Sequence, residues 1–206
     1  MKRTNKTMRK VKNGLRAKDL ITAGIFTMLF FIVVFIFAMA LSAVPVASLF
    51  ITCADALAGG VIFLYLAMKV RKFGAVAIMS AIIGLIMCLV GHFWPCIIFG
   101  IVFGLAADFL CSRGEYREFS WNAAGYAAFI LGLTLDGYTP MLLFTDAFIE
   151  TRTQMGLPSE MIKTLIDLTH GPLMIAVFAG AVLCAIIGAF TGRALLKKHF
   201  EKSGVL

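Results

Sequence analysis

The stretch LITAGIFTMLFFIVVFIFAMALSA, residues 20–43, runs for 24 positions without a charged side chain. A helix of about 20 mostly apolar residues crosses the hydrocarbon core of a bilayer, so this stretch predicts a membrane-spanning helix. It follows a basic segment, as the core of a secretory signal would, but it is longer than the roughly 7–15 apolar residues of such a core. We therefore expect a retained span that begins near residue 19.

Five further apolar stretches have the length of a span or come close to it. The six predicted spans are residues 19–43, 46–68, 74–91, 95–111, 121–144 and 172–194. Since 61% of the chain is hydrophobic, there is no room for a separate soluble domain. We predict an all-α, polytopic membrane protein, with a six-transmembrane-helix bundle over residues 19–195, a basic arm at 1–18 and a tail at 196–206.

Lysine and arginine fall in alternate gaps between these spans. Seventeen of the 19 lie in the N-terminal arm, the second gap, the fourth gap and the C-terminal tail. Because cytoplasmic loops carry an excess of Lys and Arg, we expect both termini in the cytoplasm and the first, third and fifth gaps outside. The net charge of +8 would suggest nucleic acid in a soluble chain, but basic residues beside membrane ends favour anionic lipids. We expect no nucleic-acid partner.

The gap between the fifth and sixth predicted spans, residues 145–171, is long for a compact bundle. Pro158 can occupy a first helical turn, and Met161, Leu165 and Leu168 follow at helical spacing. This pattern predicts a short amphipathic helix on the outer face. It could be a functional lid over a site or an inert interfacial helix.

Small residues recur where helices must approach closely. Gly100 and Gly104 form a G-x-x-x-G pair in the fourth predicted span, and Gly180, Gly188 and Gly192 mark the sixth. The five cysteines are scattered singly, without metal-ligand or redox spacing, so we expect neither disulfides nor a metal site.

Ionisable groups inside spans are costly, and each is a candidate functional residue. Asp55 lies near the middle of the second predicted span and Asp136 in the outer part of the fifth. Tyr138 and Thr139 follow Asp136, and Pro140 is expected to kink or break the helix and free backbone carbonyls. Asp136, Tyr138 and Thr139 could line an outward-facing pocket. The alternatives are a hydrogen bond to a neighbouring helix for Asp55 and plain solvation for Asp136.

Two histidines fall on the predicted outer side. His92 lies in a tight turn and His170 just before the sixth span. Two imidazoles on one face could hydrogen-bond an organic solute or hold the iron of a haem, although an isolated interfacial His is more often solvated. The predicted substrate-binding residues are Asp55, His92, Phe93, Trp94, Asp136, Tyr138 and His170.

The remaining polar residues favour structural roles. Asp108 is close enough in sequence to Arg113 to be compensated by it, and Asn122 is expected to cap the fifth span. No hydrolase, zinc-protease or phosphate-loop motif is present. In the predicted arrangement of spans Asp55, Asp108 and His92 lie at different depths in the membrane. This disfavours an intramembrane enzyme, which needs its reactive groups at one depth. We predict no enzyme activity, catalytic residue, metal or cofactor.

Several segments together resemble one family. They are AKDLITAGIFT (17–27), GG (59–60), KVRKFG (69–74), GHFWP (91–95) and FGIVFGLAAD (99–108). They resemble the MptD type (Trep_Strep) of substrate-binding S components of energy-coupling factor (ECF) transporters, a branch of ABC importers in bacteria and archaea. The resemblance covers the chain from residue 17 on.

The resemblance implies a six-helix S component in the plasma membrane of a prokaryote. It would capture a micronutrient outside and associate with a transmembrane coupling subunit and two ATPase subunits. Vitamins and their precursors come first as solutes, and haem or another tetrapyrrole second. Many S components carry an A-x-x-x-A pattern on the first helix for docking to the coupling subunit; the matching positions here are Ala23 and Thr27, with Gly24 beside them.

A rival hypothesis from another class is an autonomous secondary transporter or channel. Asp55 and Asp136 would then form an ion or proton relay. The two hypotheses differ in whether the chain needs ATPase partners for uptake.

Overall fold

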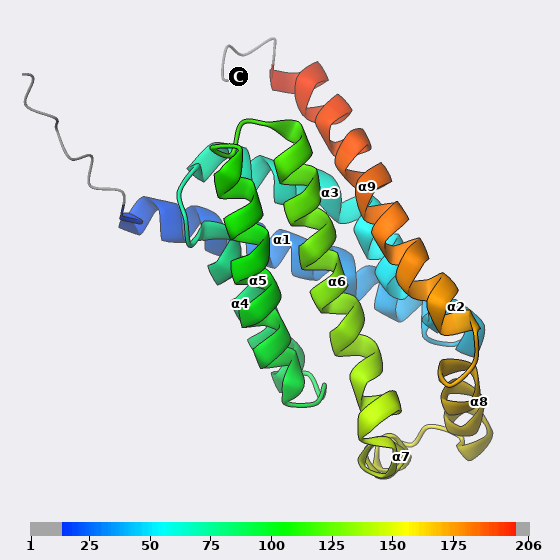
Figure 1. Cartoon of the computed structure of the whole chain (residues 1–206). Coiled ribbons are helices and arrows are strands. Elements are labelled where there is room, and N and C mark those ends of the chain that lie inside the picture. The colour runs from blue at the N-terminus through cyan, green and yellow to red at the C-terminus, as the bar shows by residue number, and fades with distance from the viewer. Residues whose placement is uncertain (1–13, 201–206) are drawn as a thin grey trace, which may run out of the picture.

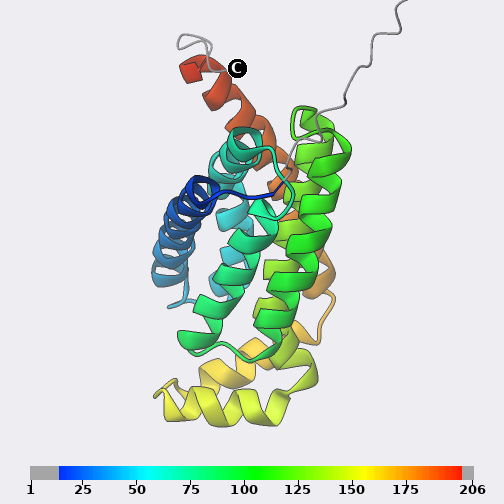
Figure 2. The same ribbon diagram turned by 90° about the vertical axis from the view of Figure 1, so that its left-hand side faces the viewer.

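The computed structural model describes residues 14–200, with side chains to residue 198. Every regular element in that range is a helix, which confirms the predicted all-α class. The helices are α1 (Ala17–Leu41), α2 (Pro45–Ser48), α3 (Ile51–Val70), α4 (Ala75–Leu89), α5 (Pro95–Arg113), α6 (Phe119–Leu143), α7 (Thr145–Gln154), α8 (Ser159–Thr169) and α9 (Leu173–Phe200). The long helices form a bundle, and α7 and α8 lie together across one end of it (Figures 1 and 2).

Five of the apolar segments are long enough to cross a membrane: α1, α2 together with α3, α5, α6 and α9. This supports a polytopic membrane protein. The third predicted span corresponds to α4, which has 15 residues. At 1.5 Å per residue α4 is about 22 Å long, shorter than the hydrocarbon core of about 30 Å. A full crossing by α4 stays a prediction.

Three boundaries differ from the sequence prediction. The second predicted span is interrupted between α2 and α3, at Leu49 and Phe50. The gap between the fifth and sixth predicted spans holds two helices, α7 and α8, where the apolar periodicity indicated only one. Helix α7 has no such stripe, but Asp146 in its first turn and Arg152 in its last turn complement the helix dipole. Helix α9 continues to Phe200, into the predicted tail.

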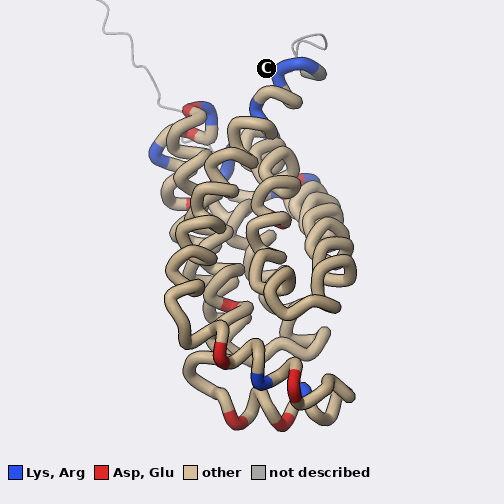
Figure 3. Tube along the Cα trace, turned by 90° about the vertical axis from the view of Figure 1, so that its right-hand side faces the viewer, with Lys and Arg blue, Asp and Glu red and all other residues tan. Residues whose placement is uncertain are grey.

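The two ends of the bundle differ in charge (Figure 3). One end carries the start of α1, the turns α3–α4 and α5–α6 and the end of α9, and it holds most of the described Lys and Arg residues. The opposite end carries α7 and α8 with four acidic residues and only two cations, Arg152 and Lys163. The predicted orientation would place this acidic end outside the cell.

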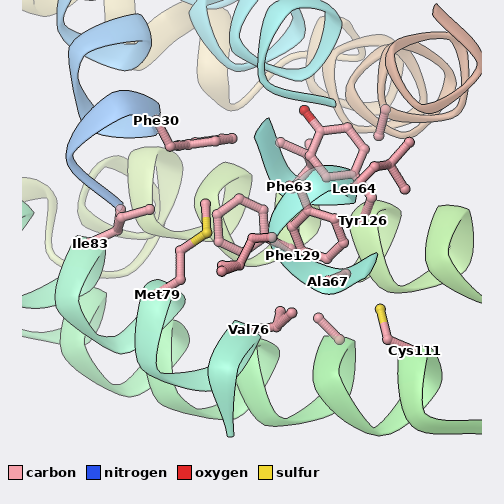
Figure 4. Close-up of a cluster of buried hydrophobic side chains, with 14 of the residues drawn as sticks. Phe30, Phe63, Leu64, Ala67, Val76, Met79, Ile83, Cys111, Tyr126 and Phe129 are labelled. Atoms are coloured by element: carbon pink, nitrogen blue, oxygen red, sulfur yellow. The ribbon is translucent and has the colours of Figure 1, made fainter. Parts of the chain in front are cut away.

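An aromatic cluster fills the middle of the bundle (Figure 4). Phe30 from α1 meets Phe129 from α6 edge to face, with ring centroids 5.1 Å apart. Phe63 from α3 packs against Tyr126 and Phe129 at 5.0 and 5.4 Å. The Tyr126 hydroxyl donates to the carbonyl of Ala56 at 2.8 Å, so the polar end of this buried ring is satisfied.

Glycines permit the closest helix contacts. A Cβ atom at Gly188 would overlap the carbonyl oxygen of Ala56, and one at Gly60 would overlap that of Gly188. Gly100 on α5 approaches Gly84 on α4 in the same way. The backbones of α3 and α9, and of α4 and α5, therefore touch without intervening side chains, as small-residue interfaces in membranes allow.

Asp108 has a structural role, but its expected partner was wrong. Its fully buried carboxylate accepts hydrogen bonds from the backbone N–H groups of Gly74 (2.7 Å) and Ala77 (3.0 Å) at the start of α4. The Tyr116 hydroxyl donates to its other oxygen at 2.6 Å. Burial and the neighbouring carboxylate raise the pKa of Tyr116, so the phenol keeps the proton that it donates. Arg113 lies over an aromatic ring on its own helix.

Asn122 does not cap α6. The helix begins at Phe119, with Glu118 as its capping residue. Asn122 lies inside the first turns, where its side-chain amide donates to the carbonyl of Tyr116 at 3.1 Å. It therefore holds the α5–α6 turn from within the helix.

Candidate solute-binding cavity

A cavity of about 340 Å³ lies between the spans and the helices α7 and α8. Its walls are mostly apolar and come from α1, α3, α6 and both end helices. The polar side chains in its lining include Thr52, Asp55, His92, Asp136, Tyr138 and Arg152. Small-molecule sites are typically about 300–1,000 Å³ and combine apolar walls with a few polar groups, so the cavity suits a small organic solute.

Four of the predicted site residues meet in this cavity: Asp55, His92, Asp136 and Tyr138. Helix α3 begins at Ile51, so Asp55 lies one turn from the start of the helix, at the end of the bundle that holds the cavity. Asp55 and His92, which were expected at different depths, both line this one cavity.

Asp136 is paired with His92 across the cavity wall. The His92 Nδ1 lies 3.2 Å from the Asp136 Oδ2, which joins the turn after α4 to α6. Asp136 is only 6% exposed, so it is not a solvated surface carboxylate. A His that keeps its second ring nitrogen free can still donate to or accept from a solute.

Helix α6 passes through Pro140 and ends at Leu143, so of the two predicted alternatives, a kink or a break, the break does not occur. Proline has no N–H, and the carbonyl of Asp136 consequently loses its usual helical donor four residues on. The Tyr138 hydroxyl, in turn, donates to the carbonyl of Leu49 in the link between α2 and α3. Tyr138 thus holds the irregular part of the second span against α6.

Asp55 has no such partner. It is 3% exposed, and its Oδ1 atom makes no hydrogen bond to any residue that the structure describes. The expected hydrogen bond from a neighbouring helix is therefore not formed in this part of the chain. A buried polar atom without a partner is rare and calls for an explanation.

Three predicted residues do not line the cavity. His170 is exposed, and its Nδ1 contacts the carbonyl of Ile166 on its own helix at 2.9 Å. Phe93 stacks on Phe144 with centroids 6.5 Å apart, and Trp94, which is 58% exposed, meets the edge of the same ring. The structure therefore does not bring His92 and His170 together on one ligand.

Arg152 and Thr52 are cavity residues that the sequence did not single out. The Arg152 guanidinium lies 5.3 Å from the centre of the Phe148 ring, and burial lowers the pKa of Arg152. Its signal in the sequence was its place as one of two cations in an acidic gap. Thr52 carried no signal, because a Thr in an apolar helix is common.

The predicted docking positions on α1 are mostly inside the bundle. Ala23 is 0% and Thr27 1% exposed, and the Thr27 hydroxyl donates to the carbonyl of Ala23 at 2.7 Å. In this structure both residues pack inside the bundle, and their role in docking stays a prediction. Gly24 alone faces open space, with nothing within 4 Å of a Cβ placed there.

A bundle of long apolar helices with a cavity at one end defines a polytopic integral membrane protein with room for a small solute. Residues 17–202 match the family model described as hypothetical bacterial integral membrane protein (Trep_Strep). The chain belongs to this family, which the sequence resemblance had indicated. No curated protein matches the chain, and no solved structure does.

Proposed function

We propose that the chain is the substrate-binding S subunit of an ECF-type importer in a bacterial plasma membrane. The observation that carries this proposal is the cavity at the acidic end, closed by α7 and α8 and lined by apolar walls with a few polar groups. It captures a small organic micronutrient from outside and delivers it with a coupling subunit and two ATPases.

The packing below the cavity supports a binding subunit over a channel. The aromatic cluster of Phe30, Phe63, Tyr126 and Phe129 fills the bundle interior with side chains that are at most 1% exposed. A channel requires a continuous path lined by groups that replace water around the solute. A pocket closed from below suits capture followed by delivery through a partner.

The residues that line the cavity favour some candidate solutes over others. A haem held between two histidines needs both imidazoles at the cavity, and His170 does not line it. One imidazole with carboxylates and a guanidinium suits a vitamin-sized solute that carries hydrogen-bonding groups. We therefore place vitamins and their precursors ahead of haem.

Contact with the coupling subunit would use the outer face of α1. Of the long apolar helices in the described chain, α1 has the smallest buried share in its most apolar stretch. Its exposed face carries Ile21, Ile25 and Met28 around Gly24, where a second helix can approach closely.

Reconstitution tests this proposal against the rival transporter. The tagged chain, coexpressed with a coupling subunit and two ATPases and purified in mild detergent, is expected to elute with all three. Proteoliposomes should then accumulate labelled vitamins only when all subunits and ATP are present. Accumulation by the chain alone, driven by an ion gradient, would contradict the proposal and favour the relay at Asp55 and Asp136.

The two histidines provide a paired test of the cavity. His92→Ala removes the partner of Asp136 and is expected to reduce, by about tenfold, the solute that stays bound during purification. His170→Ala should leave the amount unchanged, because His170 does not line the cavity and its Nδ1 contacts the carbonyl of Ile166. Mass spectrometry of released small molecules measures both. Equal retention in the two variants would remove His92 from the site.

A further inference from the structure

We propose that Asp55 binds a positively charged nitrogen of the solute, so that the captured molecule is a protonated amine or a related organic cation. This inference rests on the proposed solute-binding function and names the chemical class of its solute. It starts from a comparison of the buried carboxyl groups.

The other buried carboxyl groups in the described chain all have partners. These are Asp19 with Lys72 (2.6 Å), Asp108 with Gly74, Ala77 and Tyr116, and Asp136 with His92. Asp55 is as deeply buried as they are, yet no donor reaches it within residues 14–198. Its side chain lines the cavity. The missing donor is therefore expected to come from the molecule that occupies the cavity.

The charges of the lining favour a cation in that place. The lining holds two carboxyl groups, Asp55 and Asp136, and one guanidinium, Arg152. An unpaired carboxylate away from water is costly, and a cationic nitrogen supplies both the opposite charge and N–H donors. A cationic nitrogen would favour the ionised form of Asp55, whereas beside a neutral solute the buried carboxyl group would be protonated.

The apolar walls point to an organic cation. Phe31, Phe35 and Phe148 contribute aromatic rings to the lining. Aromatic faces attract ammonium groups and also pack well against flat apolar groups. A bare metal ion is disfavoured, because no group of three His, Cys, Asp or Glu residues in the described chain is placed to hold one.

Two probes of the same shape test the inference. Benzylamine is protonated at pH 7, whereas benzyl alcohol is neutral and almost isosteric. The purified full chain in detergent is heated with increasing concentrations of each probe. We expect benzylamine to raise the melting temperature in a saturable way and benzyl alcohol to leave it unchanged.

Variants locate the effect. Asp55→Asn keeps the shape of the side chain and removes its charge, so we expect at least about tenfold weaker benzylamine binding. Asp146→Asn makes the same chemical change on the exposed face of α7 and should bind benzylamine like the wild type. This control separates binding at Asp55 from general attraction to the acidic end.

Three results would overturn the inference: no effect of benzylamine on the wild type, equal effects of the two probes, or unchanged benzylamine binding by Asp55→Asn. The wild-type comparison of the two probes holds even if a variant folds poorly. Failure here leaves copurification with the coupling subunit intact, so the proposed function would survive. Benzylamine binding at Asp55 by a chain that assembles with no ATPases would instead remove the proposed function alone.

Discussion

Asp108→Ala is expected to lower the free energy of unfolding by about 3–5 kcal/mol, because it leaves several buried hydrogen-bond donors without an acceptor. The N–H groups of Gly74 and Ala77 would lose their acceptor at the start of α4, and the Tyr116 hydroxyl would lose its partner. No water is available at a side chain that is 0% exposed. Thermal and chemical unfolding of the purified variant in detergent measure the loss.

Tyr116→Phe is the matched control for this network. It removes one donor and leaves Asp108 with its two backbone N–H groups, so the expected loss is only about 1–2 kcal/mol. Wild-type stability in Asp108→Ala would show that the start of α4 does not depend on this carboxylate. A loss in Tyr116→Phe as large as that in Asp108→Ala would assign the effect to the α5–α6 turn.

Gly188→Ala is expected to destabilise the fold by about 3 kcal/mol, since the added methyl group has no room between α3 and α9. The nearest atoms belong to the backbone of Ala56 and Leu57, which cannot rotate away as a side chain would. The two helices would have to separate along their whole contact. Thermal unfolding in detergent reads out this change.

Gly180→Ala on the same helix gives the opposite expectation. Its Cβ would lie 3.5 Å from the Cys53 sulfur, which is an ordinary contact. Replacing a helical Gly with Ala then gains about 0.5–1 kcal/mol of helix propensity. If both variants lost stability equally, the close approach at Gly188 would not be the cause.

Much of the fold could be predicted because helix formation in a membrane depends on local composition. The run at residues 20–43 is long and apolar enough to require a helix, and the same reasoning holds for the other long spans. In the acidic gap before α9, the spacing of Met161, Leu165 and Leu168 also predicted a helix. Helix α7 was missed because its residues have no apolar period.

The sequence did not predict which face of a membrane-spanning helix packs against the rest of the bundle. Ala23 and Thr27 were assigned to the surface of α1 and are buried, while Ile21 and Ile25 are exposed. In a soluble helix, polarity separates the two faces. In a span both faces are apolar, because lipid and core have the same polarity, so the period carries little information.

The sequence by itself determined that this is an all-helical membrane protein of the Trep_Strep family, with charge segregated to its loops and candidate groups at Asp136 and Tyr138. These features depend on runs and spacings along one chain. Asp55 and His92 were candidates from the sequence as well, but only the tertiary structure decided that all four line one cavity, that Arg152 lines it too and that His170 does not. Those placements depend on the break between α2 and α3 and on how α7 folds over the bundle, which are set by contacts between distant segments.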